Sequence, residues 1–284
     1  MNLIIILCLC VLATLKVTFQ GKFAKNNVKS SYDALTFNML VFLFSALIYF
    51  KDLFSFSLPV LLFATVFGVL TVLFQMFYTK AISCGNVSLT VLIVNLSMII
   101  PIAVSVVFYS ETLTVTRLIG ICLTILALVL SVNFKETNNT VKKWIYFSIF
   151  ASLCNGGLAV CQKVFSKSIW QNEVNAFVSY SYAIAAILSV IVFLCLKHRS
   201  VLNFKFNYKT ILFALIIGII LGVFQALNTK AIAIIAGTLI FPMYYGGSLI
   251  LSFISSRVIL KEKANVQQIL SLAVGIIAII LMNL

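Results

Sequence analysis

The chain has 284 residues, of which 63% are hydrophobic and 9% are charged, and its mean hydropathy is +1.18. So few polar residues cannot cover a water-soluble globule of this length, which excludes a soluble protein and makes lipid the expected solvent. The formal net charge of +14 is spread through short loops, without a basic domain or interleaved stacking aromatic residues, which argues against nucleic-acid binding.

Apolar runs separated by basic or Gly/Asn-rich interruptions predict an all-α integral membrane protein with ten transmembrane helices. A bilayer core about 30 Å thick takes about 20 apolar residues per helix, so ten spans with short loops fill the chain. In chain order we predict helices at 2–19, 33–50, 58–80, 87–109, 115–132, 143–165, 173–196, 209–230, 235–258 and 266–284.

Lysine and arginine are distributed unevenly over the predicted loops. The loops after odd-numbered helices hold about fourteen of them, and the loops after even-numbered helices hold about five. Ten spans place both termini on one side, so the positive-inside rule predicts that both termini lie outside the cytoplasm.

An internal repeat gives the most specific pattern in the sequence. Residues Phe74–Ile82 match Phe224–Ile232 at six of nine positions, with a separation of 150 residues. Further matches occur in the same order along the chain, which argues against chance similarity of two apolar helices. They pair Gly68 with Gly218, Glu111 with Glu262, and Lys16-Val17 with Lys163-Val164.

The repeat divides the chain into two five-helix halves, residues 1–135 and 136–284. Because each half holds an odd number of spans, the second half must cross the membrane in the opposite direction to the first. We therefore predict two inverted repeats around a central cavity.

Ten short-looped helices in two halves, with Pro101 and Glu111 before the last helix of the first half, resemble the drug/metabolite transporter superfamily, particularly its EamA branch. The resemblance implies a cavity lined by the first four helices of each half, peripheral fifth and tenth helices, and alternating access. It also implies a prokaryotic inner-membrane protein with cytoplasmic termini, in conflict with the charge bias. Asn38 stands in the second helix, where relatives often carry arginine.

The leading functional hypothesis is a secondary transporter that moves a small polar or amphipathic metabolite, such as an amino acid, nucleoside or sugar. The alternatives are a non-transporting membrane receptor or scaffold, and a membrane-embedded transferase. No Walker-type segment is present, so internal ATP hydrolysis is excluded as the energy source. With one histidine and no metal-ligand spacing of the cysteines, we expect no enzyme activity, no metal and no cofactor.

Polar side chains within the predicted spans are the candidate binding residues, because they are costly in hydrocarbon unless they face protein or water. A lysine near a cavity attracts a substrate with a negative group, and the alternative for it is snorkelling to the interface. For the amides the alternative is a polar contact between helices. The candidates are Lys16, Gln75, Tyr78, Asn95, Asn155, Gln162, Lys163, Tyr180, Gln225, Asn228, Tyr244 and Tyr245.

The acidic residues are expected outside the binding site. All six fall in predicted loops or at helix ends, so no carboxylate is available at mid-membrane for proton exchange. For Glu111 we expect a structural contact with Arg117 or neighbouring lysines near the head groups. The predicted partners are thus a small-molecule substrate with a negative group and the lipid bilayer; a homodimer is considered, and the coupling ion is left open.

Overall fold

The computed structural model describes residues 2–27, 31–54, 57–84, 87–130, 141–197, 208–258 and 266–282. Across these ranges the regular structure is helical, without strands, which confirms the all-α fold. The first half contains α1 (Asn2–Asn27), α2 (Ser31–Leu47), η1 (Phe50–Phe54), α3 (Leu58–Cys84), α4 (Val87–Asn95), η2 (Leu96–Met98), α5 (Ile99–Tyr109) and α6 (Val115–Leu130). The second half contains α7 (Val141–Ser166), η3 (Gln171–Glu173), α8 (Val174–Lys197), α9 (Tyr208–Ile234), α10 (Gly237–Val258) and α11 (Val266–Met282).

The helices match the ten predicted spans, with the fourth span divided between α4, η2 and α5. Six helical stretches are long and apolar enough to cross a membrane, and four shorter apolar helices complete the set. Large side chains such as Ile4, Phe108 and Ile187 are more than half exposed, as expected where helices face lipid rather than water. The chain is therefore an integral, multi-pass membrane protein.

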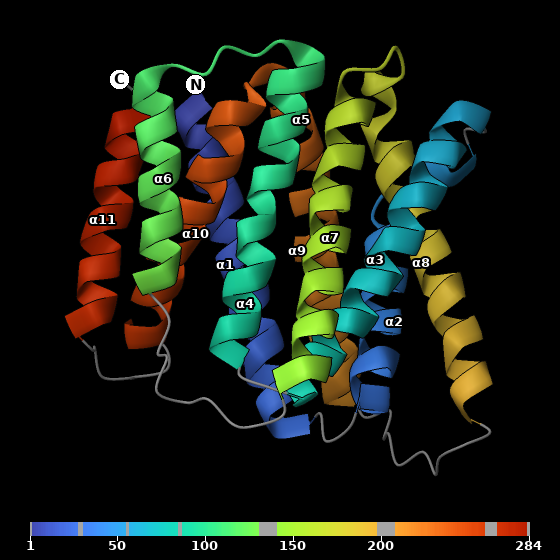
Figure 1. The fold of residues 1–284 in the computed structure, drawn as a ribbon. Coiled ribbons are helices and arrows are strands. Elements are labelled where there is room, and N and C mark those ends of the chain that lie inside the picture. The colour runs from blue at the N-terminus through green and yellow to red at the C-terminus, as the bar shows by residue number, and fades with distance from the viewer. Residues whose placement is uncertain are drawn as a thin grey trace.

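Both termini lie at the same end of the helix bundle, which we call the termini end (Figure 1). From there α1 runs away toward the opposite end, whereas α7, the first helix of the second half, runs toward the termini end. The first helices of the two predicted repeats are thus antiparallel, as an inverted repeat requires.

The two halves interlock, because helices of one half pack mainly on helices of the other. Helix α1 packs on α9 and α10, and α7 correspondingly packs on α3, α4 and α5. Likewise α2 packs on α8 and α9, while α8 packs on α2 and α3. The boundary between residues 135 and 136 remains a prediction.

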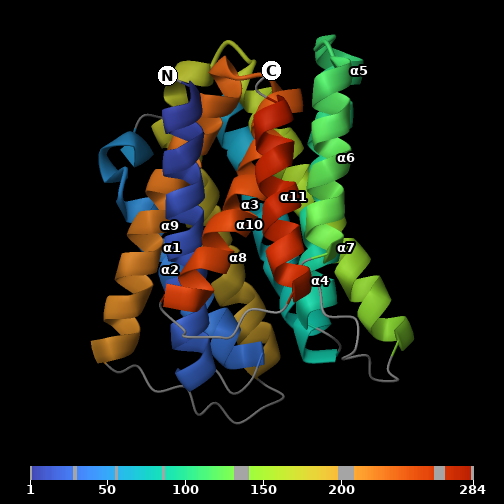
Figure 2. The same cartoon turned by 90° about the vertical axis from the view of Figure 1, so that its left-hand side faces the viewer.

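Helices α6 and α11 lie side by side at the edge of the bundle (Figures 1 and 2). Ser271 Oγ donates a hydrogen bond to the carbonyl oxygen of Ala127 at 2.7 Å, and Gly120 leaves room for Met282. These are the fifth and tenth spans, which therefore lie at the periphery.

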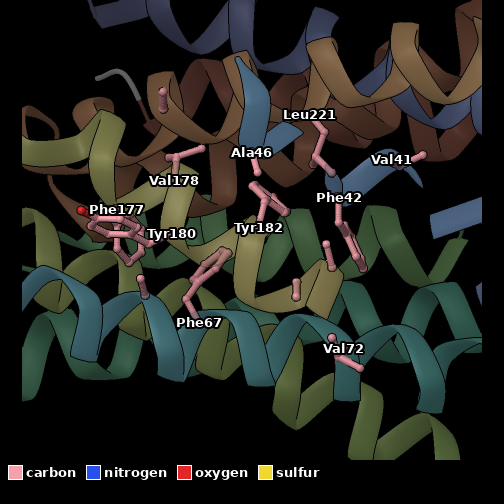
Figure 3. Close-up of a cluster of buried hydrophobic side chains, with 14 of the residues drawn as sticks. Val41, Phe42, Ala46, Phe67, Val72, Phe177, Val178, Tyr180, Tyr182 and Leu221 are labelled. Atoms are coloured by element: carbon pink, nitrogen blue, oxygen red, sulfur yellow. The ribbon is translucent and has the colours of Figure 1, made fainter. Parts of the chain in front are cut away.

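The buried side chains form two clusters. The first lies chiefly among α2, α3, α7, α8 and α9, with Phe23 of α1, and Figure 3 shows Tyr182 within it, close to Phe42, Ala46 and Phe67. The second lies chiefly among α1, α5, α6, α9, α10 and α11. Both clusters contribute side chains to the candidate site.

Candidate functional site

A cavity of about 170 Å³ lies between the two clusters, in the interior of the bundle. Its lining comes from α1, α2, α3, α7, α8, α9 and α10. Because one water molecule needs about 10–15 Å³ on this measure, the cavity can hold about ten waters or one small metabolite.

Lys16 of α1 is the charged residue in the cavity lining. Within the part of the chain that the structure describes, Lys16 makes no salt bridge, and its Nζ donates no hydrogen bond. The described residues of the lining include no carboxylate, so the positive charge faces amides, hydroxyls and aromatic rings there.

Gln75 and Gln225 occupy equivalent positions of the sequence repeat, and both line the cavity. They lie on α3 and α9, the third helices of the two halves. Neither side-chain amide has a hydrogen-bond partner among the described residues, so both amides can donate to and accept from a solute.

Gln162 is held by two residues of α9. Its Nε2 donates to Thr229 Oγ1 at 2.9 Å, while its Oε1 accepts from Asn228 Nδ2 at 3.1 Å. Thr229 Oγ1 in turn donates to the carbonyl oxygen of Gln225 at 2.9 Å. The orientation of the Gln162 amide is thereby fixed before any solute binds.

Asn155 of α7 joins both halves on another side of the cavity. Its Nδ2 lies 2.7 Å from Ser97 Oγ, 3.0 Å from Tyr245 Oη and 3.4 Å from the Val94 carbonyl oxygen. Ser97 belongs to η2, and Pro101, four residues later, has no N–H to donate to the Ser97 carbonyl group. The break in the fourth span thus presents the polar atoms that Asn155 contacts.

Aromatic rings form much of the cavity wall, and the sequence prediction missed the phenylalanines among them. The ring of Phe224 lies 5.7 Å from that of Tyr244, and the rings of Phe42 and Phe67 lie 5.8 and 6.4 Å from that of Tyr182. One signal was available, because phenylalanine precedes the repeated glutamine in both copies. The missed lining residues are Phe42, Phe67, Thr71, Phe74, Leu158, Ala159, Leu221, Phe224, Ile240 and Phe241.

The structure brings eight of the twelve sequence-predicted residues to the cavity, namely Lys16, Gln75, Asn155, Gln162, Gln225, Asn228, Tyr244 and Tyr245. Three others lie outside the cavity lining. Tyr78 stacks on Phe74 with 5.4 Å between ring centroids, and Asn95 ends α4 without capping η2 through its side chain. Tyr180 belongs to the first buried cluster, whereas Tyr182 lines the cavity.

Lys163, the fourth residue outside the lining, forms an ion pair with Glu111. The Lys163 side chain is completely buried, and its Nζ lies 5.5 Å from the centroid of the Tyr109 ring. Of the two expected partners of Glu111, Arg117 or a lysine, the structure shows a lysine, and Arg117 instead donates to the Thr112 carbonyl group and to Thr238 Oγ1. Lys163 is therefore neutralised by protein rather than snorkelling into the head groups.

Glu111 also caps a helix of the other half. The backbone N–H of Thr238, in the first turn of α10, donates to Glu111 Oε2 at 3.1 Å. A carboxylate at this position satisfies a free helical N–H group and interacts favourably with the helix dipole.

Comparisons with known proteins agree with this architecture. Residues 4–133 match the model of the EamA-like transporter family. A crystal structure described only as that of a protein superposes with a TM-score of 0.75, covering 96% of this chain and 94% of that chain at 14% sequence identity. At this identity the likeness shows the fold alone. The search of curated proteins gives no match.

Proposed function

Since this chain belongs to the EamA-like transporter family, within the drug/metabolite transporter superfamily, we propose that it moves a small polar or amphipathic metabolite with a negative group across the membrane. Members of this family are transporters, which fits a protein without enzyme activity. We further propose that transport proceeds by alternating access and that the protein resides in a prokaryotic inner membrane.

One observation supports the negative group above all others, namely that Lys16 lies in the cavity without a partner among the residues that the structure describes. A lysine ammonium removed from bulk water is costly unless water or an opposite charge replaces its hydration. The lining supplies no carboxylate, so a solute carboxylate or phosphate can provide the missing charge. Coulombic attraction in such a cavity is stronger than in water.

The rest of the lining suits the other parts of such a solute. Gln75 and Gln225 offer donors and acceptors without charge, and the Gln162 amide is oriented in advance by Asn228 and Thr229. The aromatic wall can cover an apolar portion, as amphipathic metabolites require.

The proposal can be tested by screening anionic metabolites, each beside its neutral amide, for thermal stabilisation of the purified protein. A ligand at about 100 times its dissociation constant should stabilise the protein by about 2.7 kcal/mol. We expect each anion to stabilise the protein more than its amide does. The flux of each stabilising anion is then measured in sealed proteoliposomes. Equal stabilisation by both members of each pair would contradict the negative group.

A matched pair of variants completes the experiment. Lys16→Met should remove the preference for anions and the flux of the anionic hit. Lys230→Met should change neither, because Lys230 is exposed near the end of α9 and outside the cavity lining. Ligand binding without flux in the parent protein would favour the receptor hypothesis instead.

A further inference from the structure

We propose that Glu111 closes the cavity at the termini end by occupying Lys163, and that release of this contact turns Lys163 into a second substrate-binding cation. The role of the released lysine toward substrate rests on the proposed function. The closure itself does not, since it can be measured without any substrate.

The layer between the cavity and the termini end is tightly packed. Gln162 and Asn228 are the last lining residues of α7 and α9 in that direction, since both helices end at the termini end (Figure 1). The side chains beyond them are buried. Those of Lys163, Thr229, Ile232, Ile235 and Thr238 are each at most 2% exposed.

Glu111 links three elements within this layer. It follows α5 in the first half, and its two carboxylate oxygens contact Lys163 of α7 and the N–H of Thr238 in α10. The ion pair with Lys163 requires the ionised carboxylate, whose other oxygen accepts from the Thr238 N–H group. Moving α5 away from α7 and α10 therefore breaks both contacts at once.

The backbone places Glu111 for this role. Ser110, immediately before it, has φ 49°, and is the non-glycine residue with positive φ in the described ranges. Close by, a Cβ on Gly237 would meet the hydroxyl group of Ser105, so glycine at this position lets the start of α10 approach α5 closely without displacing Ser105. An unfavourable backbone conformation beside such a contact is typical of sites where geometry is under functional constraint.

Lys163 has one obvious alternative position when Glu111 withdraws. A buried ammonium without a counter-charge is unstable, so it must reach water or another anion. Its neighbour Gln162 lines the cavity, and Lys163 is the repeat equivalent of Lys16, which already lines it. The flexible lysine stem can therefore turn toward the cavity, where a substrate anion replaces Glu111.

The test uses Asn228→Cys, which places a thiol in the cavity just below the closing layer. Membrane vesicles of each orientation receive membrane-impermeant methanethiosulfonates, one anionic and one cationic, and labelling of the parent chain is subtracted as background. Adding Glu111→Gln should raise labelling from the termini end at least about tenfold. Glu173→Gln, which changes another acid near the same end outside this contact, should leave labelling unchanged.

The charge of the two reagents tests Lys163 itself. In the Glu111→Gln background, released Lys163 should favour the anionic reagent by about fivefold, and adding Lys163→Gln should remove that preference. Unchanged labelling with Glu111→Gln would overturn the closure. Raised labelling with an unchanged reagent preference would overturn the released cation.

Loss of folding is checked by thermal unfolding of each variant, and Glu111→Asp provides a second comparison. Because aspartate keeps the negative charge, the cysteine at position 228 should be labelled more slowly in the Glu111→Asp variant than in the Glu111→Gln variant. Equal rates in the two would also contradict closure by the ion pair. A protein that passes these tests but transports nothing would refute the proposed function while leaving the closure intact.

Discussion

Ser45 Oγ donates a hydrogen bond to the carbonyl oxygen of Gly218 at 2.9 Å, across a tight contact between α2 and α9. A Cβ on Gly218 would lie 2.9 Å from the Val41 carbonyl oxygen. In the other half, a Cβ on Gly68 would lie 2.8 Å from the Ser181 carbonyl oxygen of α8. The two repeat-equivalent glycines thus make equivalent backbone contacts between the halves.

Gly68→Ala and Gly218→Ala should each destabilise the protein by about 1–3 kcal/mol, because backbone atoms cannot move aside as a flexible side chain can. Thermal unfolding in detergent measures the effect. Gly275→Ala is the control, since its Cβ would meet side-chain atoms no closer than 3.7 Å and alanine favours helix. Similar melting temperatures for Gly218→Ala and Gly275→Ala would show that the close approach is not needed.

Asn155→Leu should lower the unfolding free energy by about 1–3 kcal/mol, because it removes the donor to Ser97 and Tyr245 from the protein interior. Tyr245→Phe removes only one acceptor and should cost about 1 kcal/mol. Thermal unfolding with and without a stabilising ligand separates the two roles of this residue. If Asn155→Leu weakens ligand binding but leaves the unfolding temperature of the free protein unchanged, its role in holding the halves together is refuted.

Lys16 and Lys163 illustrate how far sequence analysis reaches. Their shared repeat position, as well as the ten apolar runs, can be read from the chain. The different contacts of the two lysines cannot be read from the sequence. Lys163 contacts Glu111 only because the segment after α5 folds beside α7, while Lys16 remains without a partner among the described residues. That difference depends on a tertiary contact between residues 52 positions apart, which local sequence patterns do not predict.

The rotation of each helix limited the site prediction in a similar way. Tyr78 lies three residues after Gln75, a spacing that places two residues on one face of a helix, yet Tyr78 stacks on Phe74 outside the lining. Tyr182 faces the cavity whereas Tyr180, two residues earlier, is buried in the first cluster. Periodicity gives relative directions around a helix, but packing against other helices decides which direction faces the cavity.

Exchanging the two charges of the Glu111–Lys163 pair should separate its contributions. Glu111→Lys alone should destabilise by about 3–5 kcal/mol, because it leaves buried charge without its partner. Adding Lys163→Glu should restore the ion pair but not the cap of α10, since an ammonium cannot accept from the Thr238 N–H. We expect a residual loss of about 1 kcal/mol by thermal unfolding. Complete recovery would show that the Thr238 contact contributes nothing.

Gln162→Glu tests the electrostatics of the cavity without altering Lys16. The new carboxylate can still accept from Asn228, but it adds a negative charge to the lining that Lys16 otherwise leaves positive. Affinity for an anionic ligand should fall about tenfold or more, since about 1.4 kcal/mol of repulsion suffices at the effective dielectric constant of such sites. Gln162→Met is the control, because it loses the donor to Thr229 and some stability but adds no charge. Isothermal titration with a hit from the anion screen measures both affinities, and equal affinities in the two variants would refute charge as the basis of binding.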